Sequence, residues 1–450
     1  MRFRSLDIFI DTRLVGVLFQ YGEGAGAITR LQPEPGYWLD PQAPVLSWAT
    51  HFDEATNRAA FVAQYTVQPF FNGVGERLPR FFQNLLPEGP LRRHLEQLRG
   101  CAPDDHFDLL AMCGDDLPGA VRATPSAQSR TATAAIVTQH QDALELSVVD
   151  DPVAGAVSLS GIQPKLGLVE KGGRYVARTR TRSDGLHIIA KLPALDYALL
   201  PEVEHLSLQL AQAAGVNVCQ ASLRPVSDIH LDDQPFVLHA GANFLAVERF
   251  DRDGTRHIHC EDFAQVLGLD PLDKYKDPQQ RANYAALLLT LCESMGLGDE
   301  AAHELLRRLM VNEMLGNYDA HVKNFGVIYA DGRTPALSPA YDVVAYAAYL
   351  GGRGHALKFY PGAPDRAQIT PALLRQLCNA SGLLETRVHA VLRDTVRRAL
   401  ATWPALIEAS ELMPEQKKRL LAHFLAVPAV EALDQRHRRA GSAGRQVSPP

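Results

Sequence analysis

The spacing of apolar residues changes near residue 252, and this change restricts the chain to a few architectures. From 157 to 252 the apolar residues form short runs typical of strands, with one helical segment at 201–216. Beyond 252 they recur every three or four positions, which predicts helices at 283–295, 299–315, 371–379 and 385–400. A β-rich unit followed by a larger helical unit predicts a bilobal α+β fold, with a cleft that a nucleotide could enter.

The composition is that of a globular protein without a disulfide framework. Hydrophobic residues form 46% and charged residues 21% of the 450 residues, which is enough apolar material for two or three packed units. The net charge of −6 argues against nucleic-acid binding over the whole surface. The six cysteines show no zinc-type spacing, no apolar run approaches about 20 residues, and the N-terminus lacks a signal-peptide pattern. We therefore expect a cytoplasmic protein with no membrane contact.

The chain divides into five expected segments. It begins with a predicted hairpin, in which Leu6, Ile8 and Ile10 share one strand face and 11–13 form the turn. Residues 124–141 are rich in Ala, Ser, Thr and Gln and lack apolar periodicity, which is typical of a linker or mobile loop. The segments are an N-terminal unit at 1–123, this linker at 124–141, a β-rich lobe at 142–252, a helical lobe at 253–434 and a disordered basic tail at 435–450.

The clearest candidate for chemistry is the segment GNYDAHVKNFGVIY at 316–329. An amphipathic helix stops at Gly316, polar residues follow, and an apolar strand begins at Phe325. Asp319 and Asn324 have the D-x-x-x-x-N spacing of a kinase catalytic loop. In such a loop the carboxylate accepts a hydroxyl proton, and the neutral amide oxygen can bind magnesium. The alternative is an ordinary turn rich in Asn and Asp.

A second candidate, Asp342, lies in SPAYDVVAY at 338–346. A predicted hairpin turn at 330–332 returns the chain, so that Asp342 can come close to Asn324. A kinase holds its second magnesium ligand at this place, although the triplet here is Tyr-Asp-Val. The alternative is an aspartate that caps a strand or a turn.

Lys191 lies in the predicted strand HIIAKLP, which resembles the V-A-I-K pattern whose lysine contacts the α- and β-phosphates. A lysine in a buried strand needs a charged partner, because desolvating an ammonium is costly. Glu204 on the next helix is the natural candidate and Glu202 is its competitor, and the sequence leaves both open. The alternative is a lysine at a strand edge that extends into solvent.

The loop SLSGIQPK at 158–165 joins two predicted strands. It has one glycine where a G-x-G-x-x-G loop has three, so it departs from the usual phosphate-binding pattern. Its backbone N–H groups around Ser160 and Gly161 could still hold phosphates, with Lys165 assisting. The alternative is a plain turn.

The segment AVERFDR at 246–252 lies where strands give way to helices. In a bilobal kinase this is the hinge, where backbone groups of Glu248 and Phe250 would meet the adenine edge. The alternative is a strand end that carries a salt bridge. Each segment is weak evidence alone, but their order along the chain is that of a kinase: loop glycine, strand lysine, helix glutamate, hinge, catalytic loop and second metal ligand.

On these motifs the chain resembles the HipA family, the toxin kinases of bacterial type II toxin–antitoxin modules. SLSGIQPK resembles the phosphate loop of that family, HIIAKLP its nucleotide lysine strand, VERFDR its hinge, NYDAHVKNFGV its catalytic loop and SPAYDVV its metal-ligand segment. The segments at 78–92 and 107–121 are similar to its N-terminal subdomain. The resemblance covers most of the chain. It implies a protein-kinase-like fold with a β-rich N-terminal lobe, a helical C-terminal lobe and the additional N-terminal subdomain.

The resemblance also implies ATP and Mg²⁺ as cofactors and roles for individual residues. The residues assigned in this way are the catalytic base Asp319, the metal ligands Asn324 and Asp342, and the phosphate contact Lys191. His321 would lie near the nucleotide, where its imidazole could respond to pH. Ser158 aligns with an autophosphorylated serine, whose phosphate would drive the loop out of the site. The nearby Ser160 leaves the phosphorylated residue open.

The family implies the function of a toxin. Such a protein would pair with a HipB-like helix-turn-helix antitoxin and reach operator DNA mainly through it. It would phosphorylate an aminoacyl-tRNA synthetase, such as glutamyl-tRNA synthetase, and thereby block translation and growth. Two alternatives are a small-molecule or lipid phosphotransferase on the same fold and a non-catalytic co-regulator that binds a DNA-binding partner. The presence of every ionisable group that phosphoryl transfer needs argues against the second.

Overall fold

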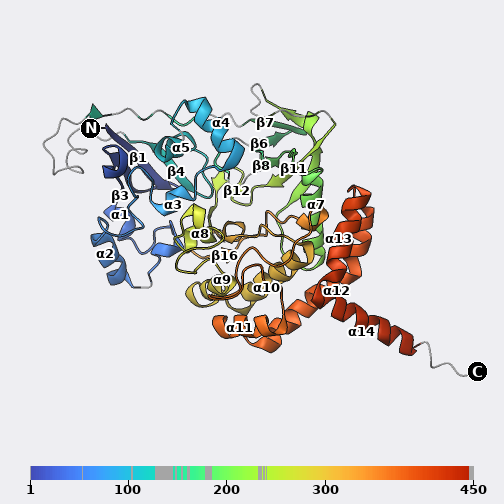
Figure 1. Ribbon diagram of the computed structural model, residues 1–450. Helices are drawn as coiled ribbons and strands as arrows, with labels where there is room; N and C mark the ends of the chain where they lie inside the picture. Colours follow the sequence, from blue (N-terminus) through green and yellow to red (C-terminus); the bar gives the residue numbers. More distant parts are fainter. Residues whose placement is uncertain are drawn as a thin grey trace, which may run out of the picture.

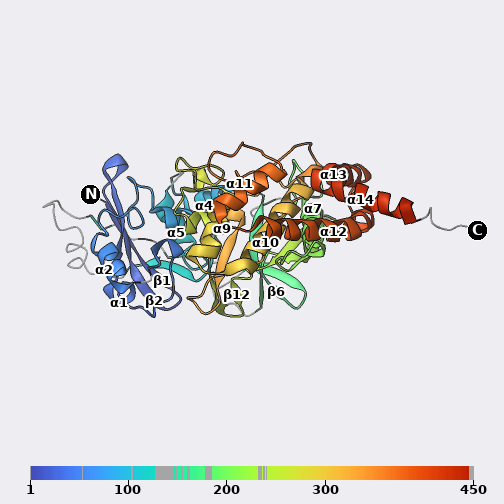
Figure 2. The ribbon, with the colours of Figure 1, turned by 90° about the horizontal axis from the view of Figure 1, so that it is seen from below.

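The computed structural model of the chain is shown in Figure 1. It describes residues 2–52, 54–102, 105–126, 145–146, 149, 151–153, 156–159, 163–177, 185–231, 236, 239 and 241–444. The described elements form an N-terminal sheet unit with short helices, a second sheet unit and a helical unit. Seen from below in Figure 2, the N-terminal unit lies at one end of the molecule and the last helix projects from the other.

The N-terminal unit is built on the hairpin predicted from its first residues. Strands β1 (Arg2–Ile10) and β2 (Arg13–Tyr21) pair antiparallel, and Leu6, Ile8 and Ile10 are buried together. The sheet order is β3-β2-β1-β4, with β5 beside β1. The other strands are β3 (Ile28–Pro33), β4 (Val121–Pro125) and β5 (Glu145–Leu146). The helices of the unit are α1 (Pro35–Trp38), α2 (Ala55–Ala63), α3 (Arg80–Gln83), α4 (Gly89–Arg99) and α5 (His106–Met112).

The second sheet contains the strand predicted to carry Lys191. Its six strands follow the order β10-β7-β6-β8-β11-β9. Their bounds are β6 (Lys165–Lys171), β7 (Arg174–Ala177), β8 (Leu186–Lys191), β9 (Ala221–Pro225), β10 (Ile229–His230) and β11 (Asn243–Glu248). Helix α7 (Leu200–Ala213) buries Val203, Leu206 and Leu210 in a core shared with the helical unit. Helix α7 therefore ties the sheet to the helical unit.

The helical unit contains the predicted helices with shifted ends. They are α8 (Phe263–Val266), α9 (Tyr284–Leu289), α10 (Gly298–Leu315), α11 (Pro371–Ser381), α12 (Glu385–Ala409), α13 (Pro414–Ala426) and α14 (Pro428–Gly444). The helix predicted at 283–295 is divided, because the turn at 290–294 widens to π-helical hydrogen bonding. The short strands of this part are β12 (Arg252–Asp253), β13 (Arg256–His257), β14 (His259–Asp262), β15 (Gly326–Tyr329) and β16 (Ala336–Leu337).

Two segments differ from the expectation. Residues 435–444 continue helix α14 instead of forming a disordered tail, because no glycine or proline interrupts the chain between Pro428 and Gly441. Residues 445–450 lie outside the described residues. Of the expected linker, the first two residues belong to β4, and 127–141 lies outside the described residues. None of the helices in the described part of the chain combines the length and apolar sequence that a membrane span needs.

Candidate active site

A cleft made of two adjoining cavities, of about 870 Å³ and about 150 Å³, brings the predicted site residues together. Both cavities are lined by Lys165, Lys191, Lys323 and Asp342. The larger cavity is also lined by Glu204, Asp319, His321 and Asn324. The smaller cavity is also lined by Ser158, Glu248 and Phe250. Every predicted site residue that the structure describes therefore faces this cleft.

Lys191, the last residue of β8, is buried between two carboxylates. Its ammonium donates to Oε1 of Glu204 on α7 and to Oδ1 of Asp342. Burial alone would lower the pKa of Lys191, but the carboxylates of Asp342 and Glu204 hold it well above its usual range. Glu202, the competing candidate, accepts instead from Nδ2 of Asn243 at 3.1 Å. Glu204 is therefore the partner of Lys191.

Lys165 places a second ammonium beside the same carboxylate. It is the first residue of β6 and the direct cross-strand neighbour of Lys191. Its Nζ lies 3.9 Å from Oδ1 of Asp342. Burial would raise the pKa of Asp342, but the ammonium groups of Lys165 and Lys191 hold it well below its usual range. Lys165 and Lys191 balance the charges of Glu204 and Asp342, and both ammonium groups line the cleft where they can contact phosphate oxygens.

The backbone of Asp342 adopts a conformation that is uncommon for residues other than glycine. Its φ of +52° lies in the left-handed region, which costs energy for a residue other than glycine. The predicted hairpin, formed by β15 and β16, returns the chain toward the catalytic loop. There the hydroxyl of Tyr341 donates to the carbonyl oxygen of Lys323 at 2.9 Å. Strained residues of this kind cluster at active sites, where the surrounding structure holds them in place.

The predicted catalytic loop folds back on itself after α10 ends at Gly316. Gly316 has a φ of +60°, and a Cβ atom there would lie 2.9 Å from side-chain atoms of Ala347 and Tyr318, so glycine is needed. Further along the loop, Nδ2 of Asn324 donates to the carbonyl oxygen of Asp319 at 3.2 Å. This bond uses the amide nitrogen of Asn324 and keeps its amide oxygen available for a metal ion.

The carboxylate of Asp319 is partly buried and accepts a hydrogen bond from the hydroxyl of Tyr275 at Oδ1. Burial raises the pKa of Asp319, and the hydrogen bond from Tyr275 opposes this shift. A raised carboxyl pKa suits a group that accepts a proton during a reaction. Sequence reasoning missed Tyr275, because it lies 44 residues before Asp319 in a segment with no recognisable motif.

His321 is buried beside Asp319 and is neutral. Burial, and the ammonium of Lys274 next in importance, lower the pKa of the His321 imidazole to about 3. This shift favours the uncharged imidazole near neutral pH and gives no support to the expected pH response. Its ring packs edge-on against the ring of Tyr275, with centroids 5.0 Å apart.

An ion cluster that sequence reasoning missed joins the N-terminal unit to the catalytic loop. Glu88, just before α4, accepts from Nζ of Lys323 at 2.7 Å and from Nζ of Lys274 at 3.1 Å. Burial would raise the pKa of Glu88, but these two ammonium groups lower it to about 2. Lys323 lies inside the predicted catalytic loop, and a lysine at this position could have indicated that an acidic partner lies nearby. Glu88 is 235 residues away, and its segment, which resembles the N-terminal subdomain of the family, does not indicate a contact with the catalytic loop.

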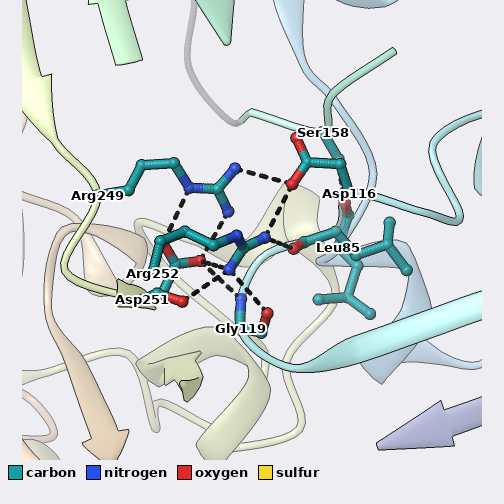
Figure 3. Close-up of polar contacts among 8 residues, drawn as sticks. Leu85, Asp116, Gly119, Ser158, Arg249, Asp251 and Arg252 are labelled. Atoms are coloured by element: carbon teal, nitrogen blue, oxygen red, sulfur yellow. Dashed lines mark hydrogen bonds and ion pairs between the residues drawn. The ribbon is translucent and has the colours of Figure 1, made fainter. Parts of the chain in front are cut away.

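Ser158, the expected phosphorylation site, is buried against the N-terminal unit (Figure 3). Its Oγ donates to the carbonyl oxygen of Leu85, and its N–H donates to the carbonyl oxygen of Asp116 at 3.2 Å. The hydroxyl must leave these contacts before it can react. Ser160 and Gly161, the other residues expected to act in this loop, lie outside the described residues.

The predicted hinge offers fewer free backbone groups than expected. The N–H of Glu248 donates to the carbonyl oxygen of Gln220 at 2.9 Å, so it cannot also bind an adenine in this conformation. Phe250 lines the smaller cavity, and its ring centroid lies 5.7 Å from that of Tyr341. An adenine at the hinge would have to contact Phe250 or the backbone carbonyl oxygen of Glu248.

Beside the hinge, two arginines and two aspartates form a buried cluster (Figure 3). Oδ1 of Asp116 accepts from Arg249 at 3.0 Å and from Arg252 at 2.8 Å. Both arginines also bind Asp251, whose Oδ2 accepts from the N–H of Gly119 at 2.9 Å. Asp116 and Gly119 precede β4 in the N-terminal unit. The salt bridges of the hinge therefore join two units of the molecule.

The donor set fits a magnesium ion. Asp342 can supply a carboxylate oxygen and Asn324 an amide oxygen, which are the ligand types that Mg²⁺ prefers. Over the described ranges, no group of three or more His, Cys, Asp or Glu side chains could hold a metal. A magnesium ion held by these two residues would take waters or phosphate oxygens as its other ligands.

The fold and the site together define a protein-kinase-like protein. A lysine–glutamate pair in the β-rich lobe, a D-x-x-x-x-N loop and a second aspartate are the parts of that class. A model of the HipA N-terminal domain matches residues 6–124, and a model of the HipA-like C-terminal domain matches residues 157–403. The chain therefore belongs to the HipA family, as its motifs predict.

Known proteins agree with this assignment. The putative kinase Y4dM of Sinorhizobium fredii is 34% identical over 407 residues, which cover 88% of this chain and 91% of the relative. The serine/threonine-protein kinase toxin HipA of Shewanella oneidensis is 24% identical, with coverage of 67% and 71%. A solved structure of HipA from that organism, in complex with HipB and operator DNA, matches with a TM-score of 0.64 at 19% identity. The match covers 93% of this chain and 96% of the other, which confirms the bilobal kinase-like α+β fold.

Proposed function

We propose that the chain is a serine/threonine protein kinase that uses Mg-ATP and acts as the toxin of a HipBA-like module. The observation that carries this proposal is the convergence of Lys191, Glu204, Asp342 and Asp319 on one cleft. Phosphoryl transfer needs these residue types in this arrangement, because its catalysis consists mostly of positioning and charge stabilisation. Membership of a family that includes a named kinase toxin supports the same function.

In the proposed reaction Asp319 accepts the proton of a serine or threonine hydroxyl as the hydroxyl oxygen attacks the γ-phosphorus of ATP. The bond from that phosphorus to the β–γ bridging oxygen breaks, and ADP leaves. Lys191 and Lys165 hold the phosphates from adjacent strands, and Glu204 fixes the ammonium of Lys191. The positive charges offset the negative charge of the transferring group.

The nucleotide would span the two cavities. Asn324 and Asp342 would hold Mg²⁺, which when bound neutralises charge on the phosphate oxygens. The adenine would occupy the smaller cavity, beside Phe250 and the backbone of Glu248. His321, which lines the larger cavity in its neutral form, would lie beside the phosphates.

The proposal extends to partners and regulation. We assign the chain a helix-turn-helix antitoxin of the HipB kind, contact with operator DNA mainly through that antitoxin, and an aminoacyl-tRNA synthetase as substrate. The complex of the Shewanella oneidensis protein with HipB and operator DNA supports the antitoxin, and the net charge of −6 supports indirect DNA contact. Autophosphorylation of Ser158, or alternatively Ser160, would add about −1.5 to −2 charges and keep the loop out of the cleft.

Purified protein incubated with γ-labelled ATP and Mg²⁺ tests the activity. The wild type should label itself on Ser158 or Ser160, located by mass spectrometry. Asp319→Asn should label at least about 100-fold more slowly, because it lacks the base. Asp331→Asn, in the exposed turn between β15 and β16, is the matched control and should label like the wild type. A wild-type protein that neither binds ATP nor becomes labelled would overturn the kinase proposal.

Expression in bacteria tests the toxin assignment separately. The wild type should arrest growth and Asp342→Ala should not, and co-expression of a helix-turn-helix protein, where one is encoded beside the gene, should relieve the arrest. Purified glutamyl-tRNA synthetase, incubated with the kinase and labelled ATP, tests the substrate. Growth that continues during wild-type expression would overturn the toxin assignment and leave the kinase activity standing.

A further inference from the structure

Tyr275 presents a hydroxyl to the proposed catalytic base. Its phenol donates to Oδ1 of Asp319, and its side chain remains 37% exposed to solvent. We infer that this hydroxyl occupies the place of the acceptor hydroxyl, so that Tyr275 is an acceptor-site residue which a substrate must displace. The inference rests on the proposed function, because it takes Asp319 as the base of phosphoryl transfer.

The position of Tyr275 is fixed by the residues around it. The carbonyl oxygen of Lys274 accepts from the N–H of Val322 at 3.2 Å, which ties the backbone before Tyr275 to the catalytic loop. The Tyr275 ring packs edge-on against the His321 ring at 5.0 Å. On the far side of Tyr275, the carboxylate of Asp277 accepts from backbone N–H groups at 281 and 282 and holds the segment there. Both flanks of Tyr275 are anchored, so its hydroxyl reaches Asp319 through a fixed backbone.

The contact has the chemistry of the reacting complex. A serine or threonine acceptor must donate its O–H to a carboxylate oxygen of the base, and the phenol of Tyr275 makes this same kind of hydrogen bond. The nucleotide would fill the cleft, so the acceptor must approach Asp319 from the protein surface. Tyr275 approaches from that surface, because more than a third of it is exposed.

This arrangement favours the transfer of phosphate to protein acceptors over its transfer to water. The phenol occupies one acceptor position of Oδ1 of Asp319, so a water molecule must compete with a tethered hydroxyl for that oxygen, and the transfer of phosphate to water is slowed. A segment of a protein substrate has further contacts with the surface that can offset the loss of the phenol hydrogen bond. Tyr275 therefore favours large acceptors over small ones at the same base.

Release of inorganic phosphate from Mg-ATP, with no protein substrate added, tests this inference, because it measures transfer to water and does not count autophosphorylation. Tyr275→Phe keeps the ring against His321 and removes only the hydroxyl. A hydrogen bond to a charged group contributes about 1.5 to 3 kcal/mol, so we expect inorganic phosphate to form roughly tenfold faster or more in this variant. The KM for ATP should not change. The assay is run at pH 8, where Asp319 stays ionised in both proteins.

Tyr349→Phe is the matched control, since its phenol donates to the carbonyl oxygen of Ala198 at 2.9 Å, away from the base. It should hydrolyse ATP like the wild type. Tyr275→Ala, with folding checked by its thermal unfolding, is a second variant and should also hydrolyse ATP faster. Unchanged hydrolysis in both Tyr275 variants would overturn the inference. Slower hydrolysis in Tyr275→Phe would overturn it too, because Tyr275 would then orient the base productively.

The wild type separates this inference from the proposed function. If the wild type transfers phosphate to itself or to water and the Tyr275 variants gain nothing, only the role of Tyr275 fails. If neither the wild type nor any variant transfers phosphate, the proposed function and the role of Tyr275 fail together.

Discussion

Lys191 shows how closely single residues of the site depend on one another. In Lys191→Met, Glu204 would stay buried at 1% exposure without its paired cation, so we expect the free energy of unfolding to fall by about 3 to 5 kcal/mol. In Lys191→Met/Glu204→Gln the buried charge is also removed. Much of the stability should then return, while phosphoryl transfer stays absent. Urea unfolding of the wild type, both single variants and the double variant measures this coupling. A double variant as unstable as Lys191→Met would contradict it.

Asp319 determines how the reaction depends on pH. Burial raises its pKa, so it loses its proton at a higher pH than an ordinary aspartate, whose pKa is about 3.9. Transfer should be fully developed above the raised pKa and should be lost as the pH falls through it, because only the ionised carboxylate accepts a proton. His321 adds no step near neutrality, since its pKa is about 3. The rate of phosphoryl transfer at saturating Mg-ATP, measured between about pH 4 and pH 8 with folding checked by circular dichroism, tests this loss at acid pH. A rate that rises on acidification would contradict the role of Asp319.

At the scale of elements, local sequence patterns predict many of the helices and strands that position the site residues. The end of α10 at Gly316 and the β15–β16 hairpin depend on residues close in sequence, so the spacing of apolar residues and the turn types indicate them. The choice between Glu202 and Glu204 is different. Residues two positions apart on a helix point to nearly opposite sides. Which of the two glutamates meets Lys191 therefore depends on how α7 packs against the sheet.

Contacts between distant elements could not be predicted in this way. The strand register that places Lys165 opposite Lys191 comes from long-range pairing, and the sequence gives only the strands. Glu88 meets the catalytic loop because the N-terminal unit packs beside it, which no local pattern describes. Tyr275 reaches Asp319 for a similar reason, from a segment that reads as an ordinary loop.

The start of α4 stabilises the catalytic loop through Glu88. The pKa of Glu88 is about 2 in the folded protein, below its ordinary value of 4.5. Its contribution to the free energy of unfolding is therefore present above the ordinary pKa and is lost as the pH falls through the folded one. Glu88→Gln should therefore lower the free energy of unfolding by about 3 kcal/mol at pH 7, because Lys323 stays buried without its carboxylate. At pH 3 the difference should be smaller. Urea unfolding at both pH values measures it.

Glu96→Gln is the matched control for this prediction. It removes only an ion pair within α4, which joins Glu96 to Arg92 at 2.8 Å. Pairs of this kind contribute about 0.5 kcal/mol or less, so the control should stay close to the wild type at both pH values. If Glu88→Gln is no less stable than Glu96→Gln at pH 7, the ion cluster does not hold the catalytic loop.

For the whole molecule, the N-terminal unit forms part of the proposed nucleotide site. Asp116 binds both hinge arginines, Arg249 and Arg252, and its carbonyl oxygen holds Ser158. Asp116→Asn keeps the shape and removes the charge, so we expect a loss of about 3 kcal/mol in stability and weaker binding of ATP. Urea unfolding and calorimetric titration with Mg-ATP measure the two effects. Asp40→Asn, which removes an exposed ion pair in the same unit, should leave ATP binding unchanged. An Asp116→Asn protein that binds ATP as tightly as the wild type would contradict this role.

The charges at the centre of the cleft also limit which substitutions the protein can accumulate during evolution. Lys165 and Lys191 are positive, Glu204 and Asp342 are negative, and the four lie together. A single inherited substitution leaves one charge without its opposite among side chains that are largely buried. The loss of one lysine together with one carboxylate leaves the remainder neutral. In a lineage that has lost the activity, we therefore expect substitutions to remove one lysine together with one carboxylate. The lysine and carboxylate that remain in a descendant would show which pair was lost first.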